Sequence, residues 1–220
     1  MSNTILTQTI QTAIKNNKIV PFYQVIRRKD DEINQYTKFE VLARINDTFE
    51  EASKPFIFIE IAKKLNLYHE IQQQIIEKSL QDILEFKKTN SNLKFSINIQ
   101  MDDINNDQTI QFLEDKLKCS GLAQNIVFEL SEEDALTEAK GKKTKQFIEK
   151  FKQIGCEFAL DDFGTGYSSF HPLIEFEFDY LKFDKVLVEN LYKEPKKYYI
   201  CDMLVEFSKR TNLKVIAEYV

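Results

Sequence analysis

The sequence predicts an α/β protein, a TIM-like (βα)8 barrel whose first strand is antiparallel. Short segments rich in β-branched and aromatic residues alternate with longer segments in which apolar residues recur at helical spacing. This alternation is typical of parallel strands joined by crossover helices. The first two strand segments are separated only by the polar link 28–35, which is too short for a crossover helix, so this pair is expected to be an antiparallel hairpin. With 220 residues, of which 43% are hydrophobic, the chain can bury one sizeable core, and one domain is expected.

Strands and helices can be assigned along most of the chain from these patterns. Strands are expected at Val20–Arg27, Tyr36–Ile45, Lys94–Ile99, Ile126–Leu130, Glu157–Leu160, Tyr180–Phe183 and Lys214–Glu218. Helices are expected at Thr4–Ile14, Ile57–Tyr68, Glu70–Lys87, Gln108–Leu117, Lys143–Ile154 and Lys196–Lys209. A complete barrel of this type typically needs about 250 residues, and the last strand segment ends close to Val220. We therefore expect a single barrel domain over residues 1–220 that lacks the last βα unit.

Composition excludes several classes of function. The net charge of −5 argues against binding to duplex nucleic acid, which needs a basic surface. Cys119, Cys156 and Cys201 lie far apart, so they have the spacing of neither a disulfide framework nor a zinc site, and reduced thiols are expected. No signal peptide or membrane span is apparent within the chain. A cytoplasmic location is therefore expected.

Polar residues collect where the expected strands end. A carboxylate, an amide or an ammonium closes nearly every central strand, and the residues are Glu40, Asn98, Glu129, Asp161, Asp162, Lys182, Asp184 and Glu218. In α/β barrels, functional residues lie at the carboxyl ends of the strands. Such a ring of charge is costly unless it is well paired or binds cations, and oxygen ligands suit Mg²⁺ and Mn²⁺.

Asp161 and Asp162 are adjacent, so they would face opposite sides of a regular strand. For both to reach one site, the strand is expected to end there, and Gly164 and Gly166 make a turn easy. Any one of these features alone has a plainer explanation, because a single acid at a strand end is more often solvated or salt-bridged than a ligand. The coincidence across six strands favours a metal site. A nucleophilic triad of the nearby serines with His171 is a much weaker alternative.

These residues together resemble the EAL domain family, bacterial phosphodiesterases that hydrolyse cyclic di-GMP to linear pGpG. The segment Asp161-Asp162-Phe163-Gly164-Thr165-Gly166-Tyr167-Ser168-Ser169 looks like the signature loop of that family at every position. Glu40-Val41-Leu42 stands in place of the Glu-Ala-Leu that names the family, with Arg44 in place of its arginine. Tyr23-Gln24, Leu181-Lys182-Phe183-Asp184 and Ala217-Glu218 also match.

The resemblance implies a two-metal phosphodiesterase site and assigns roles to its residues. The Mg²⁺ or Mn²⁺ ligands would be Glu40, Asn98, Glu129, Asp161 and Asp162. The catalytic residues would be Lys182, Glu218 and Glu40. The residues that bind substrate would be Arg44, Gln24 and Asp184. The residues that support the signature loop would be Glu132, Gly164, Thr165 and Gly166.

Other properties of the family extend these expectations. A homodimer through the signature-loop region and an attached sensory or nucleotide-cyclase domain are implied, with cyclic di-GMP as the ligand. Some EAL-like domains are catalytically inactive and serve as cyclic di-GMP receptors or protein-interaction modules, and this alternative stays open. A barrel hydrolase acting on another phosphodiester is a third possibility, because one fold supports many chemistries.

Overall fold

The computed structural model describes residues 3–27, 37–46, 54–135, 138–165 and 170–218. These residues group into two compact units. The first unit comprises residues 1–97 and 111–125, and the second comprises residues 98–110 and 126–220. Each unit is described by itself below, and the single domain expected from the sequence stays a prediction. Across the described residues, every helix is too short or too polar to cross a membrane.

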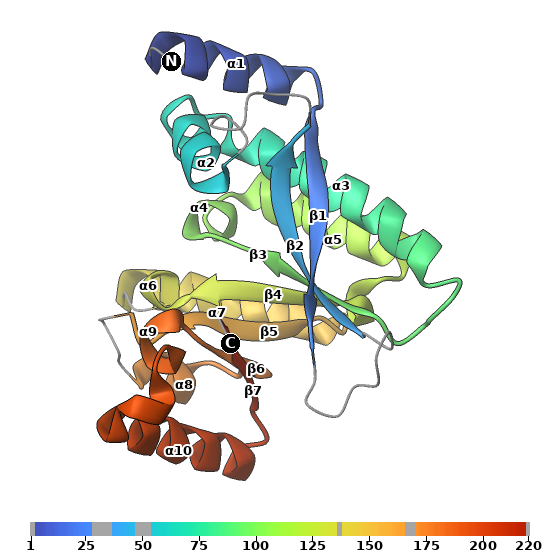
Figure 1. The fold of residues 1–220 in the computed structure, drawn as a ribbon. Coiled ribbons are helices and arrows are strands. Elements are labelled where there is room, and N and C mark those ends of the chain that lie inside the picture. Colours follow the sequence, from blue (N-terminus) through green and yellow to red (C-terminus); the bar gives the residue numbers. More distant parts are fainter. Residues whose placement is uncertain (1–2, 28–36, 47–53, 136–137, 166–169, 219–220) are drawn as a thin grey trace. The chain divides into compact units, whose positions relative to one another are not determined.

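The first unit is built around an antiparallel hairpin (Figure 1). Its elements are α1 Asn3–Lys15, β1 Ile19–Ile26, β2 Lys38–Ile45, α2 Pro55–Lys64, α3 Tyr68–Phe86, most of β3 Lys94–Asn98, the later part of α5 Asp107–Ser120, and the 3-10 turn η1 Ala123–Asn125. Strand β1 pairs antiparallel with β2, and Gln24 lies opposite Glu40. Strand β2 then runs parallel to β3, with Glu40 beside Ser96. The expected antiparallel first strand is confirmed.

Helix α3 holds the start of the hairpin in place. The side chain of Gln74 donates to the Ile14 carbonyl at 2.7 Å and accepts from the Ile19 N–H at 3.2 Å. The ammonium of Lys78 donates to the carbonyl of Asn17 at 2.7 Å and to that of Ile19. These bonds satisfy backbone groups at the junction of α1 and β1, which would otherwise be left unpaired near the core.

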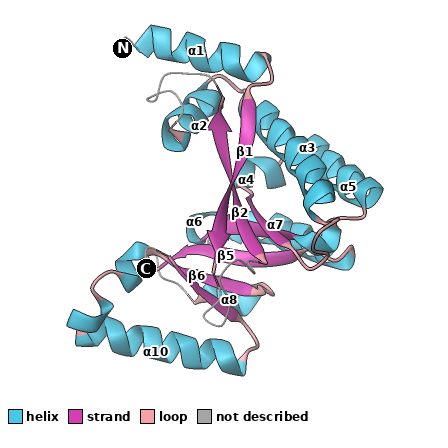
Figure 2. Ribbon diagram, turned by 45° about the vertical axis from the view of Figure 1, so that its right-hand side comes forward, coloured by secondary structure: helices cyan, strands magenta, loops and turns pink. Residues whose placement is uncertain are grey.

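The second unit consists of parallel strands that are each followed by helical segments, and Figure 2 shows this alternation by colour. Its elements are α4 Met101–Ile104, β4 Ile126–Ser131, α6 Glu132–Ala135, α7 Glu138–Gln153, β5 Glu157–Phe163, α8 His171–Glu175, β6 Tyr180–Phe183, α9 Lys185–Val188, η2 Leu191–Lys193, α10 Pro195–Arg210 and β7 Lys214–Ala217. Strand β5 pairs parallel with β4 and with β6, and β6 pairs parallel with β7. The carboxyl ends of these strands therefore lie at one edge.

Strand β4 is apolar along almost its whole length because both of its faces are covered, as is usual for parallel sheets. Phe128 is fully buried, and its ring contacts those of Phe147 and Phe151 on α7 and Phe158 on β5, with centroids 5.3 to 5.7 Å apart. This aromatic cluster fixes α7 against the strands. It also places Glu129, the next residue of β4, at the edge where the charged residues gather.

Two sequence expectations are wrong in detail. Strand β5 does not end at Asp161 and Asp162; it continues to Phe163, and its register with β6 shifts between Leu160 and Phe163. Asp162 adopts a φ of 55°, so a bulge redirects the side chains while the strand goes on. The helix expected over Ile57–Tyr68 ends earlier, at Lys64, and Tyr68 already belongs to α3. Asn66 adopts a φ of 55° between the two helices, a conformation that asparagine tolerates well.

The aromatic cluster gives a test of the packing. We expect Phe128→Ala to lower the free energy of unfolding by about 3–5 kcal/mol, because it removes a fully buried ring and leaves a cavity. Urea denaturation followed by circular dichroism measures this loss. Phe56→Ala is the matched control, since Phe56 is 70% exposed and should cost less than about 0.5 kcal/mol. Equal losses in the two variants would contradict the assignment of the core.

Candidate metal and catalytic site

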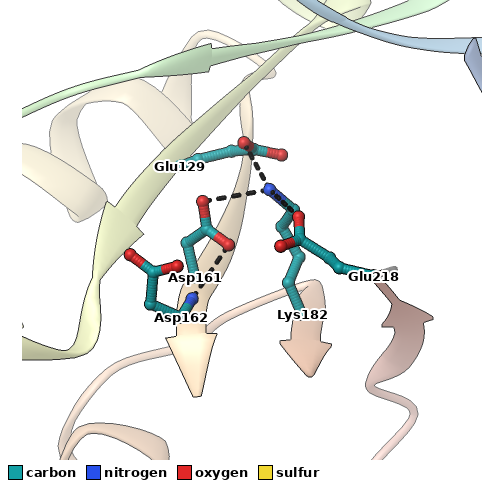
Figure 3. Close-up of polar contacts among 5 residues, drawn as sticks. All are labelled: Glu129, Asp161, Asp162, Lys182 and Glu218. Atoms are coloured by element: carbon teal, nitrogen blue, oxygen red, sulfur yellow. Dashed lines mark hydrogen bonds and ion pairs between the residues drawn. The ribbon is translucent and has the colours of Figure 1, made fainter. Parts of the chain in front are cut away.

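A buried ammonium lies at the carboxyl ends of β4 to β7. Lys182 Nζ on β6 is 2.9 Å from Glu129 Oε2 on β4, 3.0 Å from Asp161 Oδ2 on β5 and 2.9 Å from Glu218 Oε1 just after β7. Figure 3 shows the three carboxylates around the tip of the lysine. The four residues were predicted from the sequence as parts of one site, and the structure brings them together. We call Glu129, Asp161, Asp162, Lys182 and Glu218 the acid–lysine cluster.

Charge in the acid–lysine cluster is not balanced. The side chain of Lys182 is 1% exposed and that of Glu129 is fully buried, so both ions have lost their water. A buried charge persists only when it is paired and hydrogen-bonded. The ammonium of Lys182 provides such a partner for the carboxylate of Glu129. One lysine, however, faces the carboxylates of Asp161 and Glu218 as well, with Asp162 nearby (Figure 3). The surplus of negative charge suits a bound cation.

The bulge in β5 places a fourth carboxylate at the same point. Ligand oxygens of Asp161, Asp162 and Glu218 all lie within 4.8 Å of one another. The N–H of Asp162 donates to Asp161 Oδ1 at 2.9 Å, which stabilises the turn in the strand. Partial burial and the neighbouring carboxylates of Asp161 and Glu218 raise the pKa of Asp162 to about 6. Three carboxylate oxygens at this spacing fit a hard divalent ion such as Mg²⁺ or Mn²⁺. Such an ion would also relieve the repulsion between the three negative charges.

The loop after β5 is held from two sides. Glu132 Oε2 accepts a hydrogen bond from the Gly164 N–H at 3.2 Å, and Thr165 Oγ1 donates to the Asp162 carbonyl at 3.1 Å. Gly164 has a φ of +107°, and a Cβ there would lie 2.6 Å from Leu187. A glycine is therefore required for both its backbone angle and its small size. Leu187 was not anticipated, because nothing in its sequence context distinguishes it, and Gly166 lies outside the described residues.

Asn98 and Asp184 also lie at strand ends of the second unit. Asn98 is the exposed last residue of β3, and the N–H of the following Ile99 donates to the Glu129 carbonyl at 2.9 Å. Asp184 caps α9, because its side chain accepts a hydrogen bond from the Val186 N–H at 2.8 Å. Its negative charge also contributes to the raised pKa of Asp162. The proposed ligand role of Asn98 and the proposed substrate contact of Asp184 stay predictions.

The remaining predicted residues belong to the first unit. Glu40 lies opposite Gln24 on β1 and beside Ser96 on β3, so the three side chains share one face of that sheet. Arg44 Nη1 donates to the Ala43 carbonyl at 2.8 Å, and the guanidinium lies 5.9 Å from the centre of the Phe22 ring. In this structure, Arg44 therefore packs on its own hairpin. The proposed roles of Glu40, Gln24 and Arg44 stay predictions.

A large cavity of the second unit lies away from this chemistry. It has a volume of about 920 Å³ and is lined by α7, α10 and the segment 173–179. Asp179 and Leu213 in its lining come just before β6 and β7, so the cavity is at the amino ends of these strands. In α/β barrels the functional groups lie at the opposite ends. The candidate metal and catalytic site is therefore placed at the charged residues and not in this cavity.

Comparison with known proteins identifies the family of this chain. The chain belongs to the EAL domain family, because the model of the EAL domain matches residues 7–220. Cyclic di-GMP phosphodiesterase PdeB of Shewanella oneidensis is 26% identical over 96% of this chain and 24% of its own length. Probable cyclic di-GMP phosphodiesterase PdeN of Escherichia coli is 30% identical over 95% of this chain and 40% of its own length. The chain thus spans well under half the length of these relatives.

A solved structure supports the fold. The PaMucR phosphodiesterase in complex with c-di-GMP matches with a TM-score of 0.84 at 21% identity, over 98% of this chain and 87% of that chain. This likeness shows the fold alone. It confirms the α/β, TIM-like class that the alternation of strands and helices predicted.

The crowding of carboxylates predicts a dependence on pH. Because the pKa of Asp162 is raised to about 6 from an unfolded value of about 4, the folded protein binds a proton more readily between these values. The metal-free protein therefore gains stability as the pH falls through 6. We expect Asp162→Asn to be more stable than the parent at pH 7.5 by up to about 1 kcal/mol, since the side chain is only partly buried and solvent screens its charge. Asparagine also accepts the left-handed backbone of this position.

Thermal unfolding in EDTA at pH 7.5 and at pH 5 measures this effect, and the difference in Tm between variant and parent should shrink at pH 5. Asp202→Asn, at an exposed carboxylate on α10, serves as the control and should show no such change. A difference in Tm that does not depend on pH would contradict the electrostatic explanation.

The buried ammonium predicts a linkage between stability and metal. We expect Lys182→Met to lower the free energy of unfolding of the metal-free protein by about 3–5 kcal/mol, because Glu129 is left buried without its positive partner. Excess Mn²⁺ should restore part of this loss. Urea unfolding in EDTA and in Mn²⁺ measures both effects. Lys152→Met is the control, since Lys152 pairs with Asp179 where both side chains are a quarter or more exposed. This substitution should lower the free energy of unfolding by about 1 kcal/mol or less. Equal losses in the two variants would contradict the role of burial.

Proposed function

We propose that this chain hydrolyses cyclic di-GMP to linear pGpG in the presence of Mg²⁺ or Mn²⁺. The observation that supports this most directly is the acid–lysine cluster, which combines a surplus of carboxylates with a buried ammonium at the carboxyl ends of parallel strands. The choice of cyclic di-GMP as the substrate is supported by membership of the EAL domain family and by relatives named as cyclic di-GMP phosphodiesterases.

The residues that would hold the ions are those with oxygen donors at the strand ends. Asp161, Asp162 and Glu218 offer ligand oxygens close together, and Glu129, Asn98 and Glu40 are proposed as further ligands. When bound, the two ions supply charge stabilisation of the phosphoryl oxygens and a water of lowered pKa. The surplus negative charge described above would favour their binding.

Lys182 would orient the carboxylates and the attacking water. Its three ion pairs fix the directions of Glu129, Asp161 and Glu218, so these groups are preorganised before substrate arrives. As a cation, it would also stabilise negative charge that develops in the transition state. Glu218, at 22% exposure, would reach the reacting centre and accept a hydrogen bond from water.

Residues outside the acid–lysine cluster would bind the substrate. A guanidinium can clamp a phosphate with two parallel hydrogen bonds, so Arg44 is proposed to leave its contact with the Ala43 carbonyl and hold a phosphate of cyclic di-GMP. Gln24 and Asp184 are proposed to contact the rest of the ligand. Glu132 and the loop around Gly164 would keep Asp162 in place.

We further propose a cytoplasmic homodimer that receives its regulation from an attached sensory or nucleotide-cyclase domain. The apolar side chains of Phe170, Ile174 and Val186 on and around α8 and α9 are exposed, and Phe170 directly follows the signature loop in the sequence. Exposed apolar side chains of this kind are common at interfaces between subunits.

The proposed reaction is tested by incubating the protein with cyclic di-GMP and Mg²⁺ or Mn²⁺ and separating pGpG by chromatography. We expect metal-dependent appearance of pGpG, abolished by EDTA. Asp161→Asn should lower the rate by at least about 100-fold, because a ligand of the ions is lost, whereas Asp202→Asn should not change it. Turnover of other phosphodiesters at the same rate would contradict the substrate assignment. If the protein binds cyclic di-GMP but forms no pGpG with either metal, the proposed enzyme is contradicted and the chain is a cyclic di-GMP receptor.

A further inference from the structure

A fully buried carboxylate lies on α4, the short helix that follows β3. Asp103 on α4 is 1% exposed, although an aspartate is rarely buried unless it is paired or hydrogen-bonded. Its Oδ2 accepts a hydrogen bond from the N–H of Gln100, the N-cap residue of this helix, at 3.0 Å. None of the roles discussed above uses Asp103.

The hydrogen bond between Gln100 and Asp103 lies directly after the end of β3. Asn98 ends β3, and the next two backbone N–H groups are both held. The N–H of Ile99 donates to the Glu129 carbonyl at 2.9 Å, and the N–H of Gln100 donates to Asp103. The backbone that leaves Asn98 is therefore fixed first by the strand that bears Glu129 and then by Asp103.

Helix α4 is in turn anchored to the interior of the unit. Met101 and Ile104 are buried, and the hydroxyl of Thr144 on α7 donates to Met101 Sδ at 3.6 Å. A helix of four residues cannot persist through its own backbone bonds. Its packing on α7 gives Asp103 a fixed position, from which the carboxylate can act on the strand end.

We propose that Asp103 is a positioning residue of the metal site, which holds the turn after β3 and with it the strand end that bears Asn98, a residue proposed with Glu129 to bind a divalent ion. This rests on the proposed function, because that function makes Asn98 and Glu129 ligands. A carboxylate forms a stronger hydrogen bond with an N–H than a neutral oxygen does. Residues that orient a metal ligand from outside the first layer commonly change metal affinity by about 10–100-fold.

Metal affinity is the direct test. The probe is Mn²⁺, titrated into the metal-free protein by calorimetry with electron paramagnetic resonance of free Mn²⁺ as a second measure. We expect Asp103→Ala to weaken Mn²⁺ binding by about 10-fold. Asp103→Asn should restore most of the affinity, because the amide oxygen can accept the Gln100 N–H.

A matched control separates positioning from general destabilisation. Asn106 is the cap of α5, three residues further on, where its Oδ1 accepts from the N–H groups of Gln108 and Thr109 at 2.9 and 3.1 Å. Asn106→Ala also removes a helix cap, so its urea midpoint in EDTA should fall as that of Asp103→Ala does. Its Mn²⁺ affinity should be unchanged. Equal losses of affinity in the two variants would overturn the proposal.

Combining Asp103→Ala with Asn98→Ala shows whether Asp103 acts through Asn98. We expect the double variant to bind Mn²⁺ no more weakly than Asn98→Ala alone, since effects on one shared interaction do not add. Additive losses would overturn the proposed route. If the parent protein does not bind Mn²⁺, or Asp161→Asn does not weaken its binding, the proposed metal site itself fails. If both behave as expected while Asp103→Ala binds normally, only the role of Asp103 fails.

Discussion

The contact between the buried ammonium of Lys182 and three carboxylates is the constraint on which the second unit depends. Strand β6 has four residues, all buried, and one of them is a charged lysine. Its charge can be kept in the interior only if neighbouring strands supply acceptors. They come from β4, β5 and the residue after β7, so one lysine fixes the relative heights of all four strand ends.

That arrangement is stable and strained at the same time. Lys182 pairs well with Glu129, but the bulge in β5 brings Asp162 to the same place as Asp161 and Glu218. The result is a left-handed backbone angle at an aspartate and a raised pKa. Strain of this kind is tolerated at functional sites when the surrounding structure compensates for it. Here the aromatic cluster around Phe128 supplies rigid support directly beneath the charges.

Much of the fold and the membership of the acid–lysine cluster could be predicted from the sequence, because both depend on local patterns. Alternating apolar segments mark strands, and a polar residue at the end of an apolar run must lie at the edge of the sheet. The bulge could not be predicted, since it depends on how β5 pairs with β6. The short helices α4, α6, α8 and α9 were missed because four or five residues show no helical period. The depth of Lys182 was also missed, since burial depends on packing across several strands.

The acidic residues at the strand ends divide into two kinds that sequence spacing does not distinguish. Glu129, Asp161 and Glu218 face the ammonium, whereas Asp103, Glu132 and Asp184 accept hydrogen bonds from backbone N–H groups that follow strands β3, β5 and β6. The first kind creates the negative potential that a cation would neutralise. The second kind holds the loops from which ligands would project. The negative charge of each of these carboxylates is stabilised by the backbone N–H group that donates to it. A cluster with so many like charges therefore needs the second kind, because loops under mutual repulsion would otherwise separate and the carboxylates would no longer converge.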